Sequence, residues 1–404
     1  MMDYGKMCYT GFATVSKNVK HELKQHFGNR LQLDICAINH FGDNYTEPDG
    51  TIVFSAKNND FKQDDFGRNG FMKILNDSDD YDGIFIIADL GIVCPITNIL
   101  RSILQNKIEN NRKRFKSVWY FAADCKLFPA LLKDMEFFDS LVTMTEFGRN
   151  EIIRLRPDLK NKLSVSFHGT NTKDFHPLSA ESKKEAREFF GRNADKFIIT
   201  NVNRNQPRKD LPNTIFAFIE AKRLWTASRQ PFLYLHCHPA DPKGHNLRSI
   251  LMQTELIDGV DYMLLPKRFE KDMATVSQLN ALYNASDLFV TTTLGEGWGL
   301  SITEAFATKL PVICPPTTSM LEISGGGKRA TLTSLIIPFV SPTDNVIREQ
   351  TDYAEMGELI VSTANAIMEE DKLLKEKTEA AYNWAQQHTW KDECKNWIEI
   401  FKKY

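Results

Sequence analysis

The sequence lacks a basic excess and a membrane-length apolar segment. Its 404 residues carry 50 Lys and Arg against 52 Asp and Glu, for a formal net charge of −2, whereas nucleic-acid-binding domains usually carry a basic excess. No window reaches the roughly 18–20 apolar residues of a membrane-spanning helix, and the N-terminal segment does not resemble a secretory signal. We therefore expect neither a nucleic-acid partner nor a membrane span, while peripheral membrane contact stays open.

The sequence also lacks a disulfide pattern and a dinucleotide-binding motif. Its seven cysteines are scattered, odd in number and mostly placed in apolar runs, which is typical of free thiols in a reducing compartment. This distribution favours a cytoplasmic protein. Gly11 precedes the first amphipathic segment, but the surrounding residues do not form G-x-G-x-x-G. A dehydrogenase is therefore not favoured.

Strand-like and helix-length segments alternate along the whole chain. Short apolar, β-branched or aromatic runs recur, about five before residue 170 and about six after residue 195. Continuous apolar strands separated by helices predict parallel sheets covered on both faces. The length suits two domains of about 150–200 residues each. The sequence therefore predicts an α/β protein with two doubly wound domains.

A cationic cluster follows the strand expected at 197–202. It consists of Arg204, Arg208 and Lys209, and a helix is expected to begin near residues 210–212. Ligands of open parallel sheets bind beyond the carboxyl ends of the strands. Cations beside a helix N-terminus can bind an anion of diphosphate size. The alternative is a set of solvated surface charges.

Two carboxylates flank a glycine turn in residues 295–305, GEGWGLSITEA. Glu296 lies in the turn, and Glu304 lies where the next helix is expected. Glycines 297 and 299 leave amides exposed for phosphate, and carboxylates accept hydrogen bonds from sugar hydroxyls. This combination indicates a nucleotide sugar, with one carboxylate for each sugar ring. The alternative is that Glu304 belongs to an S-x-x-E capping box and Glu296 is a loop carboxylate.

Residues 295–323 resemble the E-x7-E region of retaining GT-B glycosyltransferases, in particular glycosyltransferase family four. ASDLFV before this stretch and A-x5-PVI within it make the match specific. NRNQPRKDL resembles the diphosphate-binding segment of the family, with Arg204 and Lys209 at its arginine-to-lysine spacing. Residues 168–178 resemble the segment that closes the first domain, and residues 385–404 resemble the terminal helix.

The resemblance implies a GT-B fold, in which two Rossmann-like domains face a cleft. It places an acceptor-side domain at 1–178, a nucleotide-sugar-binding domain at 179–387, and a helix that crosses back to the first domain at 388–404. It further implies metal-independent sugar transfer to an acceptor hydroxyl, with the anomeric configuration retained. The donor would be a nucleoside diphosphate sugar, with GDP-mannose favoured ahead of a UDP-sugar. The acceptor would be a carbohydrate, glycan or glycoconjugate.

The resemblance also assigns roles to individual residues. Glu304 would hold the ribose hydroxyls and Glu296 the donor-sugar hydroxyls, while Arg204 and Lys209 would neutralise the departing diphosphate. Further donor contacts would come from Gly11, Asn203, Gly297, Trp298, Gly299 and Leu300.

Three residues of the first domain are candidates for the reacting centre or the acceptor side. Asp124 follows an expected strand and would face the donor sugar, and Asp89 is a candidate on the acceptor side; either could instead cap a helix. His168 is a candidate base or a structural histidine between the domains. A nucleotide-sugar epimerase or phosphorylase of the same fold and a non-catalytic sugar-nucleotide binding module stay open as alternatives.

Overall fold

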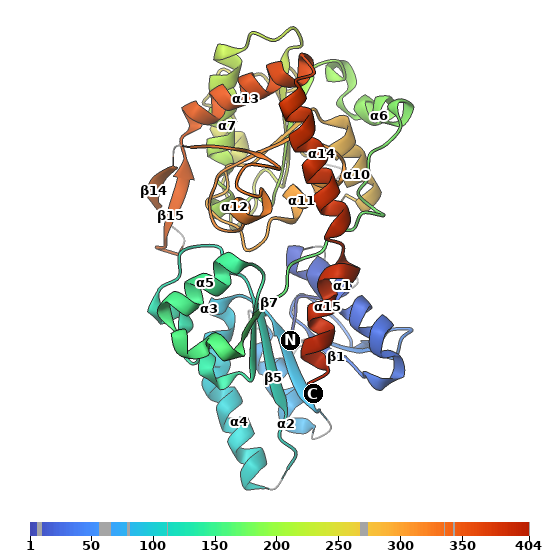
Figure 1. Ribbon diagram of the computed structural model, residues 1–404, viewed down its shortest axis with the longest axis vertical. Coiled ribbons are helices and arrows are strands. Elements are labelled where there is room, and N and C mark those ends of the chain that lie inside the picture. The colour runs from blue at the N-terminus through green and yellow to red at the C-terminus, as the bar shows by residue number, and fades with distance from the viewer. Residues whose placement is uncertain are drawn as a thin grey trace. The chain divides into compact units, whose positions relative to one another are not determined.

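The computed structural model describes residues 1–5, 10–55, 66–78, 81–110, 112–266, 274–334, 336–341 and 344–403. The chain forms two compact units, whose elements are labelled in Figure 1. The first unit consists of Met1–Ala123, Leu127–Gly169 and Trp390–Tyr404, and the second of Asp124–Lys126 and Thr170–Thr389. The units divide after Gly169 and after Thr389. The boundaries predicted from the sequence lie after residues 178 and 387. Asp124–Lys126 belongs to the second unit although the chain on either side of it belongs to the first.

The first unit is built on parallel strands. Four of them lie in the order β4 (Gly83–Ile87), β5 (Lys116–Phe121), β6 (Ser140–Thr143) and β7 (Leu163–Val165). A second group pairs β1 (Asp34–Ala37) with β3 (Ile52–Ser55) in parallel, and β2 (Tyr45–Thr46) lies antiparallel to β3. Met2 bridges both Ala37 and Ile87. The N-terminal residues thus connect the two groups of strands.

Helices alternate with these strands along the chain. The helix α1 begins at Gly11 because the Thr10 hydroxyl caps it by accepting from the Ala13 amide, and it buries Val15, Val19 and Leu23 at intervals of four residues. The α-helices of the first unit are α1 (Gly11–Phe27), α2 (Arg68–Asp77), α3 (Leu90–Val93), α4 (Thr97–Glu109), α5 (Glu146–Leu155) and α15 (Trp390–Phe401).

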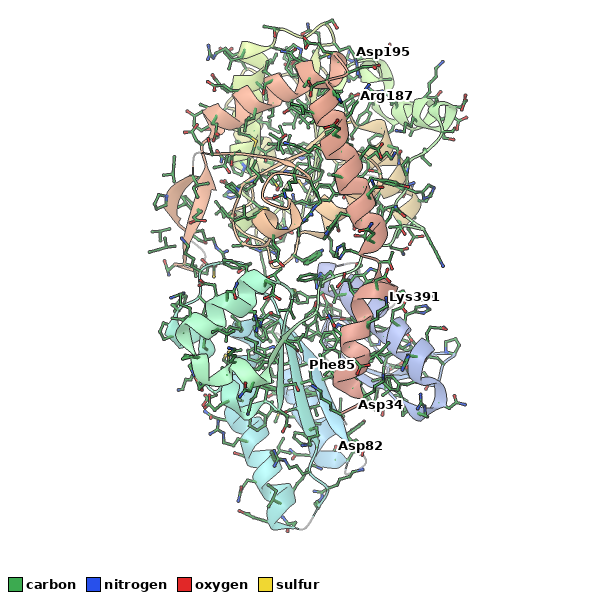
Figure 2. All side chains as sticks on the ribbon, in the orientation of Figure 1. Asp34, Asp82, Phe85, Arg187, Asp195 and Lys391 are labelled. Atoms are coloured by element: carbon green, nitrogen blue, oxygen red, sulfur yellow. The ribbon has the colours of Figure 1, made fainter. Side chains whose placement is uncertain are left out.

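The C-terminal helix α15 packs within the first unit. Its Trp397 is fully buried, with ring centroids 4.9 Å from Phe85 of β4 and 4.7 Å from Tyr120 of β5. Phe85 is labelled beside α15 in Figure 2. Aromatic side chains of this size contribute much of the apolar area that a contact between elements buries. The last helix is therefore packed against β4 and β5.

The second unit contains a six-stranded parallel sheet. Its order is β10-β9-β8-β11-β12-β13, formed by β8 (Phe197–Val202), β9 (Pro231–His236), β10 (Tyr262–Leu264), β11 (Leu288–Val290), β12 (Val312–Cys314) and β13 (Thr331–Leu332). Residues in the central strands are buried almost without interruption, as expected for a parallel sheet covered on both faces. Two further strands, β14 (Ile336–Val340) and β15 (Ile347–Thr351), form a separate antiparallel pair.

The helices of the second unit cover this sheet. They are α6 (Ala180–Arg187), α7 (Leu211–Leu224), α8 (Leu247–Leu251), α10 (Val276–Ala285), α11 (Leu300–Ala307), α12 (Ser319–Ile323), α13 (Tyr353–Met368) and α14 (Lys372–Gln387). Ile215 and Phe218 of α7 and Met356 and Ile360 of α13 share one buried cluster with strand residues such as Leu233. This core fixes the position of the loops that follow the strands.

Two expectations from composition concern thiols and membrane helices. The cysteines at 36, 94, 125, 237, 314 and 394 form no disulfide among the described residues, and Cys8 lies outside those residues. Across the part of the chain that the structure describes, no helix is both long and apolar enough to pass through a membrane.

Candidate functional site

The second unit brings cations and a carboxylate together at the end of two neighbouring strands. Arg208 and Lys209 lie between β8 and α7, and Glu296 lies between β11 and α11. The Lys209 Nζ is ion-paired with Glu296 Oε1, and Arg208 Nη1 donates to Glu296 Oε2 at 3.0 Å and to the Gly295 carbonyl at 2.9 Å. β8 and β11 are adjacent in the sheet, which explains why segments 87 positions apart meet here.

Burial and neighbouring charges set the ionisation of Glu296 and Lys209. Burial by itself would raise the pKa of Glu296, but Lys209 and Arg208 bring it down to about 2. Burial lowers the pKa of Lys209 to about 8 against the opposing effect of Glu296. Glu296 is 6% exposed. At neutral pH the carboxylate is ionised and Lys209 is mainly protonated, so the cluster holds full charges in a largely dry environment.

Asp124 joins this cluster from the short segment assigned to the second unit. Its carboxylate lies 3.3 Å from Arg208 Nε and 3.6 Å from Arg348 Nη2, and its carbonyl accepts from Arg348 Nη1 at 2.7 Å. The Asp124 carbonyl approaches Gly295 so closely that a Cβ at position 295 would lie 2.0 Å from the oxygen. Glycine is therefore required at position 295 for this packing.

The glycine turn leads into α11 without a side-chain cap. The helix begins at Leu300, and Gly299 occupies the N-cap position with φ 110°. The Ile302 amide donates to the Gly299 carbonyl at 3.0 Å. Because Gly299 has no side chain to cap the helix, the amides at the very start of α11 can bind water or a ligand. The capping-box interpretation of Glu304 is wrong, since the residue at position 301 lies inside the helix. Anion binding at this helix end remains physically reasonable.

The predicted turn residues are held in place by neighbouring segments. The Glu296 amide donates to Thr318 Oγ1 at 2.9 Å, and the Trp298 carbonyl accepts from Ser319 Oγ at 2.6 Å. The Trp298 ring stacks on Trp384 with centroids 6.3 Å apart. Gly297 and Gly299 belong to the same turn, and Leu300 is the first residue of α11. These contacts give the turn a defined shape.

Glu304 lies one turn into α11 and meets a tyrosine. The Tyr283 hydroxyl donates to Glu304 Oε2 at 2.7 Å, and Tyr283, on α10, is fully buried. Burial raises the pKa of Glu304 to about 7, and the Tyr283 hydrogen bond acts in the opposite direction. The other carboxylate oxygen, Oε1, is not the acceptor of this bond. Glu304 can therefore change protonation near neutral pH.

Arg204 and Asn203 point to other partners. The Arg204 side chain is 53% exposed, and its Nε donates to Asp241 Oδ2 at 2.9 Å. Asn203 donates to Asn201 Oδ1 at 2.8 Å and to Thr291 Oγ1 at 3.4 Å. The structure thus brings Lys209 and Arg208 to Glu296, while Arg204 pairs with Asp241. Arg208 belongs to the cationic cluster predicted from the sequence, but no catalytic role was predicted for it.

The remaining predicted residues lie in the first unit. Gly11 is the first residue of α1, and Asp89 occupies the N-cap position of α3, where its carbonyl accepts from the Ile92 amide at 3.0 Å. His168 is buried, with its ring 5.7 Å from Tyr120 and 5.6 Å from Trp390. Burial lowers the pKa of His168 to about 3. A neutral, packed imidazole fits the structural alternative better than a base.

Arg348 and Tyr283 were not singled out from the sequence. Neither belongs to the motifs at 203–211 or 295–305, and Arg348 reaches Asp124 across 224 positions of the chain. Such partners carry no local sequence signal. Within the described ranges, no group of three or more His, Cys, Asp or Glu side chains is arranged to hold a metal ion; metal independence itself stays a prediction.

Comparisons with known proteins relate part of the chain to glycosyltransferases. A family model described as "Glycosyl transferases group 1" matches residues 268–344, which include Glu296 and Glu304. A probable sucrose-phosphate synthase of Thermosipho melanesiensis is 25% identical over 210 residues, which are 50% of this chain and 44% of that protein. The chain therefore spans less than half the length of this curated relative.

Several solved structures resemble almost the whole chain. A sucrose-phosphate synthase from Thermosynechococcus elongatus aligns with a TM-score of 0.68 at 14% identity, covering 98% of this chain and 93% of that one. A structure described as trehalose-6-phosphate from E. coli bound with UDP-2-fluoro glucose aligns with a TM-score of 0.64 at 12% identity, covering 99% and 98%. The chain has the α/β GT-B fold with two Rossmann-like domains, as the sequence predicted.

Proposed function

We propose that this protein is a glycosyltransferase that moves a sugar from a nucleoside diphosphate sugar to an acceptor hydroxyl with retention of the anomeric configuration. The observation that carries the proposal is the pairing of Arg208 and Lys209 with the buried Glu296. This cluster lies beside the uncapped N-terminus of α11, which also contains Glu304. The family match over residues 268–344 supports the same assignment.

The proposed reaction assigns a task to each charged group. The bond between the anomeric carbon and the phosphate oxygen breaks, and the bonding electrons leave with the diphosphate. Arg208, Lys209 and the α11 amides stabilise the negative charge that grows on it; removing one such preorganised donor typically costs about 2.7–4 kcal/mol of barrier. Glu296 binds donor-sugar hydroxyls and Glu304 binds ribose hydroxyls. Arg204 would reach the same diphosphate after leaving Asp241.

The acceptor hydroxyl attacks the anomeric carbon on the face from which the diphosphate departs. Its proton passes to the oxygen of the leaving phosphate, so no enzyme carboxylate has to form a covalent bond to the sugar. Asp124 would assist at this centre by holding Arg208. No step of this scheme uses a metal ion, so we propose that turnover is metal-independent. The acceptor would be a carbohydrate, glycan or glycoconjugate.

We propose two candidate donors. GDP-mannose is the preference from the NRN sequence at 203–205. A UDP-sugar is supported by the structurally similar protein that is bound with UDP-2-fluoro glucose. Both donors present the same diphosphate to the cluster, so they are to be tested side by side.

The experiment begins with a thermal-shift screen of GDP-mannose and UDP-sugars, followed by acceptor trials with the stabilising donor. Glu296→Ala should lower turnover by about 10² or more while donor affinity changes little. Glu255→Ala is the matched control, since Glu255 is exposed. Product NMR reads the anomeric configuration, and turnover in a chelator tests metal independence.

Other outcomes would assign a different function. Donor binding without turnover for any acceptor would indicate a binding module. Nucleotide release without an acceptor, or conversion of the donor to its epimer, would indicate one of the other activities of the same fold. Inversion at the anomeric carbon would contradict the proposed stereochemistry.

A further inference from the structure

The strand β15 lies outside the six-stranded sheet but contacts the charged cluster. Among the described residues it pairs with β14 alone, in the antiparallel ladder that joins Ile336–Val340 to Ile347–Thr351. Figure 1 shows this pair beside the rest of the second unit. Residues two apart in a strand share a face. On β15 these are Arg348 and Gln350, and both side chains bond to aspartates that adjoin the cationic cluster.

Arg348 contacts both the backbone carbonyl and the carboxylate of Asp124. Its side chain is 4% exposed; Nη1 donates to the Asp124 carbonyl at 2.7 Å, and Nη2 lies 3.6 Å from the Asp124 carboxylate. Nη2 also donates to Asp344 Oδ2 at 2.9 Å. Asp124 in turn contacts Arg208 at 3.3 Å. Arg348 thereby fixes the backbone and the side chain of the residue against which Arg208 is oriented.

Gln350 bonds to the residue that follows Lys209. Its Nε2 donates to Asp210 Oδ2 at 2.7 Å, and Asp210 follows Lys209 directly. Asp210 has φ 48°, a left-handed conformation that turns the chain from Lys209 into α7. Next along β15, the Thr351 carbonyl accepts from Asn213 of α7 at 2.7 Å. The strand is thus attached on both sides of Arg208 and Lys209.

The composition of β15 favours a role in positioning over a role in the apolar core. The side chains that face the cluster are a guanidinium and an amide, and burying such groups is costly unless they are paired. Ile347, the first residue of the strand, is 67% exposed. A strand that leaves an isoleucine in solvent and buries an arginine gains little apolar area. What the strand supplies instead is a set of hydrogen-bonded contacts, which include those to Asp124 and Asp210.

We propose that β15 is a brace for the diphosphate-binding cations, and that Arg348 and Gln350 are positioning residues that make the site prefer a nucleoside diphosphate over a monophosphate. The inference rests on the proposed function. Neither residue is assigned a contact with substrate. Arg348 acts through Asp124 on Arg208, and Gln350 acts through Asp210 on Lys209.

The test compares UDP with UMP and GDP with GMP by calorimetry on the full chain. The variants are Arg348→Met, Arg348→Lys and Gln350→Ala, and Ile347→Thr is the control on the exposed side of the same strand. In Arg348→Met, the preference of the wild type for the diphosphate should fall on the order of tenfold, the equivalent of one hydrogen bond to a charged group, with monophosphate affinity nearly unchanged. Arg348→Lys should restore part of the preference.

A purely structural role predicts a different pattern. It would lower the melting temperature and weaken both nucleotides equally, and that result would overturn the inference, as would an unchanged ratio in a folded Arg348→Met protein. If Arg348→Met does not fold, Arg348→Lys and Gln350→Ala decide by the same ratio. A wild type that does not distinguish diphosphate from monophosphate would remove the proposed function first, and the inference with it.

Discussion

The Tyr283 hydroxyl donates a hydrogen bond of 2.7 Å to Glu304, the carboxylate proposed to bind the donor ribose. Tyr283 comes from α10 and Glu304 from α11, and both lie in the second unit. Burial raises the pKa of Glu304 to about 7. The protonation of this carboxylate is therefore expected to control donor binding in the neutral range.

Donor affinity should increase as the pH rises through 7. Only the ionised form of Glu304 offers all its lone pairs to ribose hydroxyls, and its pKa is about 7. Tyr283→Phe removes a bond that stabilises the ionised form, so it should move the midpoint of the affinity profile to higher pH. Calorimetric titration of the nucleoside diphosphate from about pH 5.5 to about pH 7.5, below the pKa of about 8 at which Lys209 loses its charge, measures both effects. A Tyr283→Phe profile that coincides with the wild type would contradict this assignment.

The pairing of Glu296 predicts a loss of stability in acid. Its pKa falls from 4.5 to about 2 in the folded protein, so the stabilisation is present above about pH 4.5 and is lost as the pH falls toward 2. Glu296→Gln should remove this part of the acid dependence and destabilise the protein at pH 7 by about 3–5 kcal/mol, because Lys209 loses its charged partner. Urea unfolding at several pH values measures this. An unchanged acid slope in Glu296→Gln would show that other groups dominate.

Arg208 and Arg204 should respond differently to mutation. Arg208→Ala should lower kcat by about 10²–10³, since its guanidinium directly contacts Glu296 beside the proposed diphosphate position. Asp241→Asn should release Arg204 from its 2.9 Å bond and tighten diphosphate binding by about two- to fivefold, the modest value of an exposed ion pair.

Steady-state kinetics and calorimetry provide these measurements. The control for Asp241→Asn is the double variant with Arg204→Ala, in which the gain should vanish. Tighter binding that persists in the double variant would mean that Arg204 is not the group released.

Gly295→Ala should disturb the site through packing alone. An added Cβ would lie 2.0 Å from the Asp124 carbonyl oxygen, so the turn and the Asp124 segment have to separate. We expect destabilisation of about 1–3 kcal/mol together with loss of activity. Gly91→Ala is the matched control, since its Cβ would have no heavy atom within 4 Å. Thermal unfolding and turnover are the measurements; a fully active, equally stable Gly295→Ala protein would mean that this close approach is not needed.

Local sequence patterns determined the class of fold and pointed to charged residues of the candidate site. Uninterrupted apolar strands separated by helical segments predicted two parallel α/β domains, because a parallel sheet is buried on both faces. The close spacing in the sequence of Arg208 and Lys209, and of Glu296 and Glu304, likewise predicted an anion site with carboxylates. Such features are visible because they depend on neighbouring residues.

The tertiary structure decided which of these groups meet and what holds them. Arg204 and Arg208 are equally basic in the sequence, yet only Arg208 faces Glu296, because the path of the loop after β8 sets the direction of each side chain. Arg348 and Tyr283 have their roles because folding brings them to partners that are distant in the sequence. Arg348 meets Asp124 across 224 positions, and Tyr283 meets Glu304 across 21. The elevated pKa of Glu304 arises from burial, a property of the folded chain that no local pattern specifies.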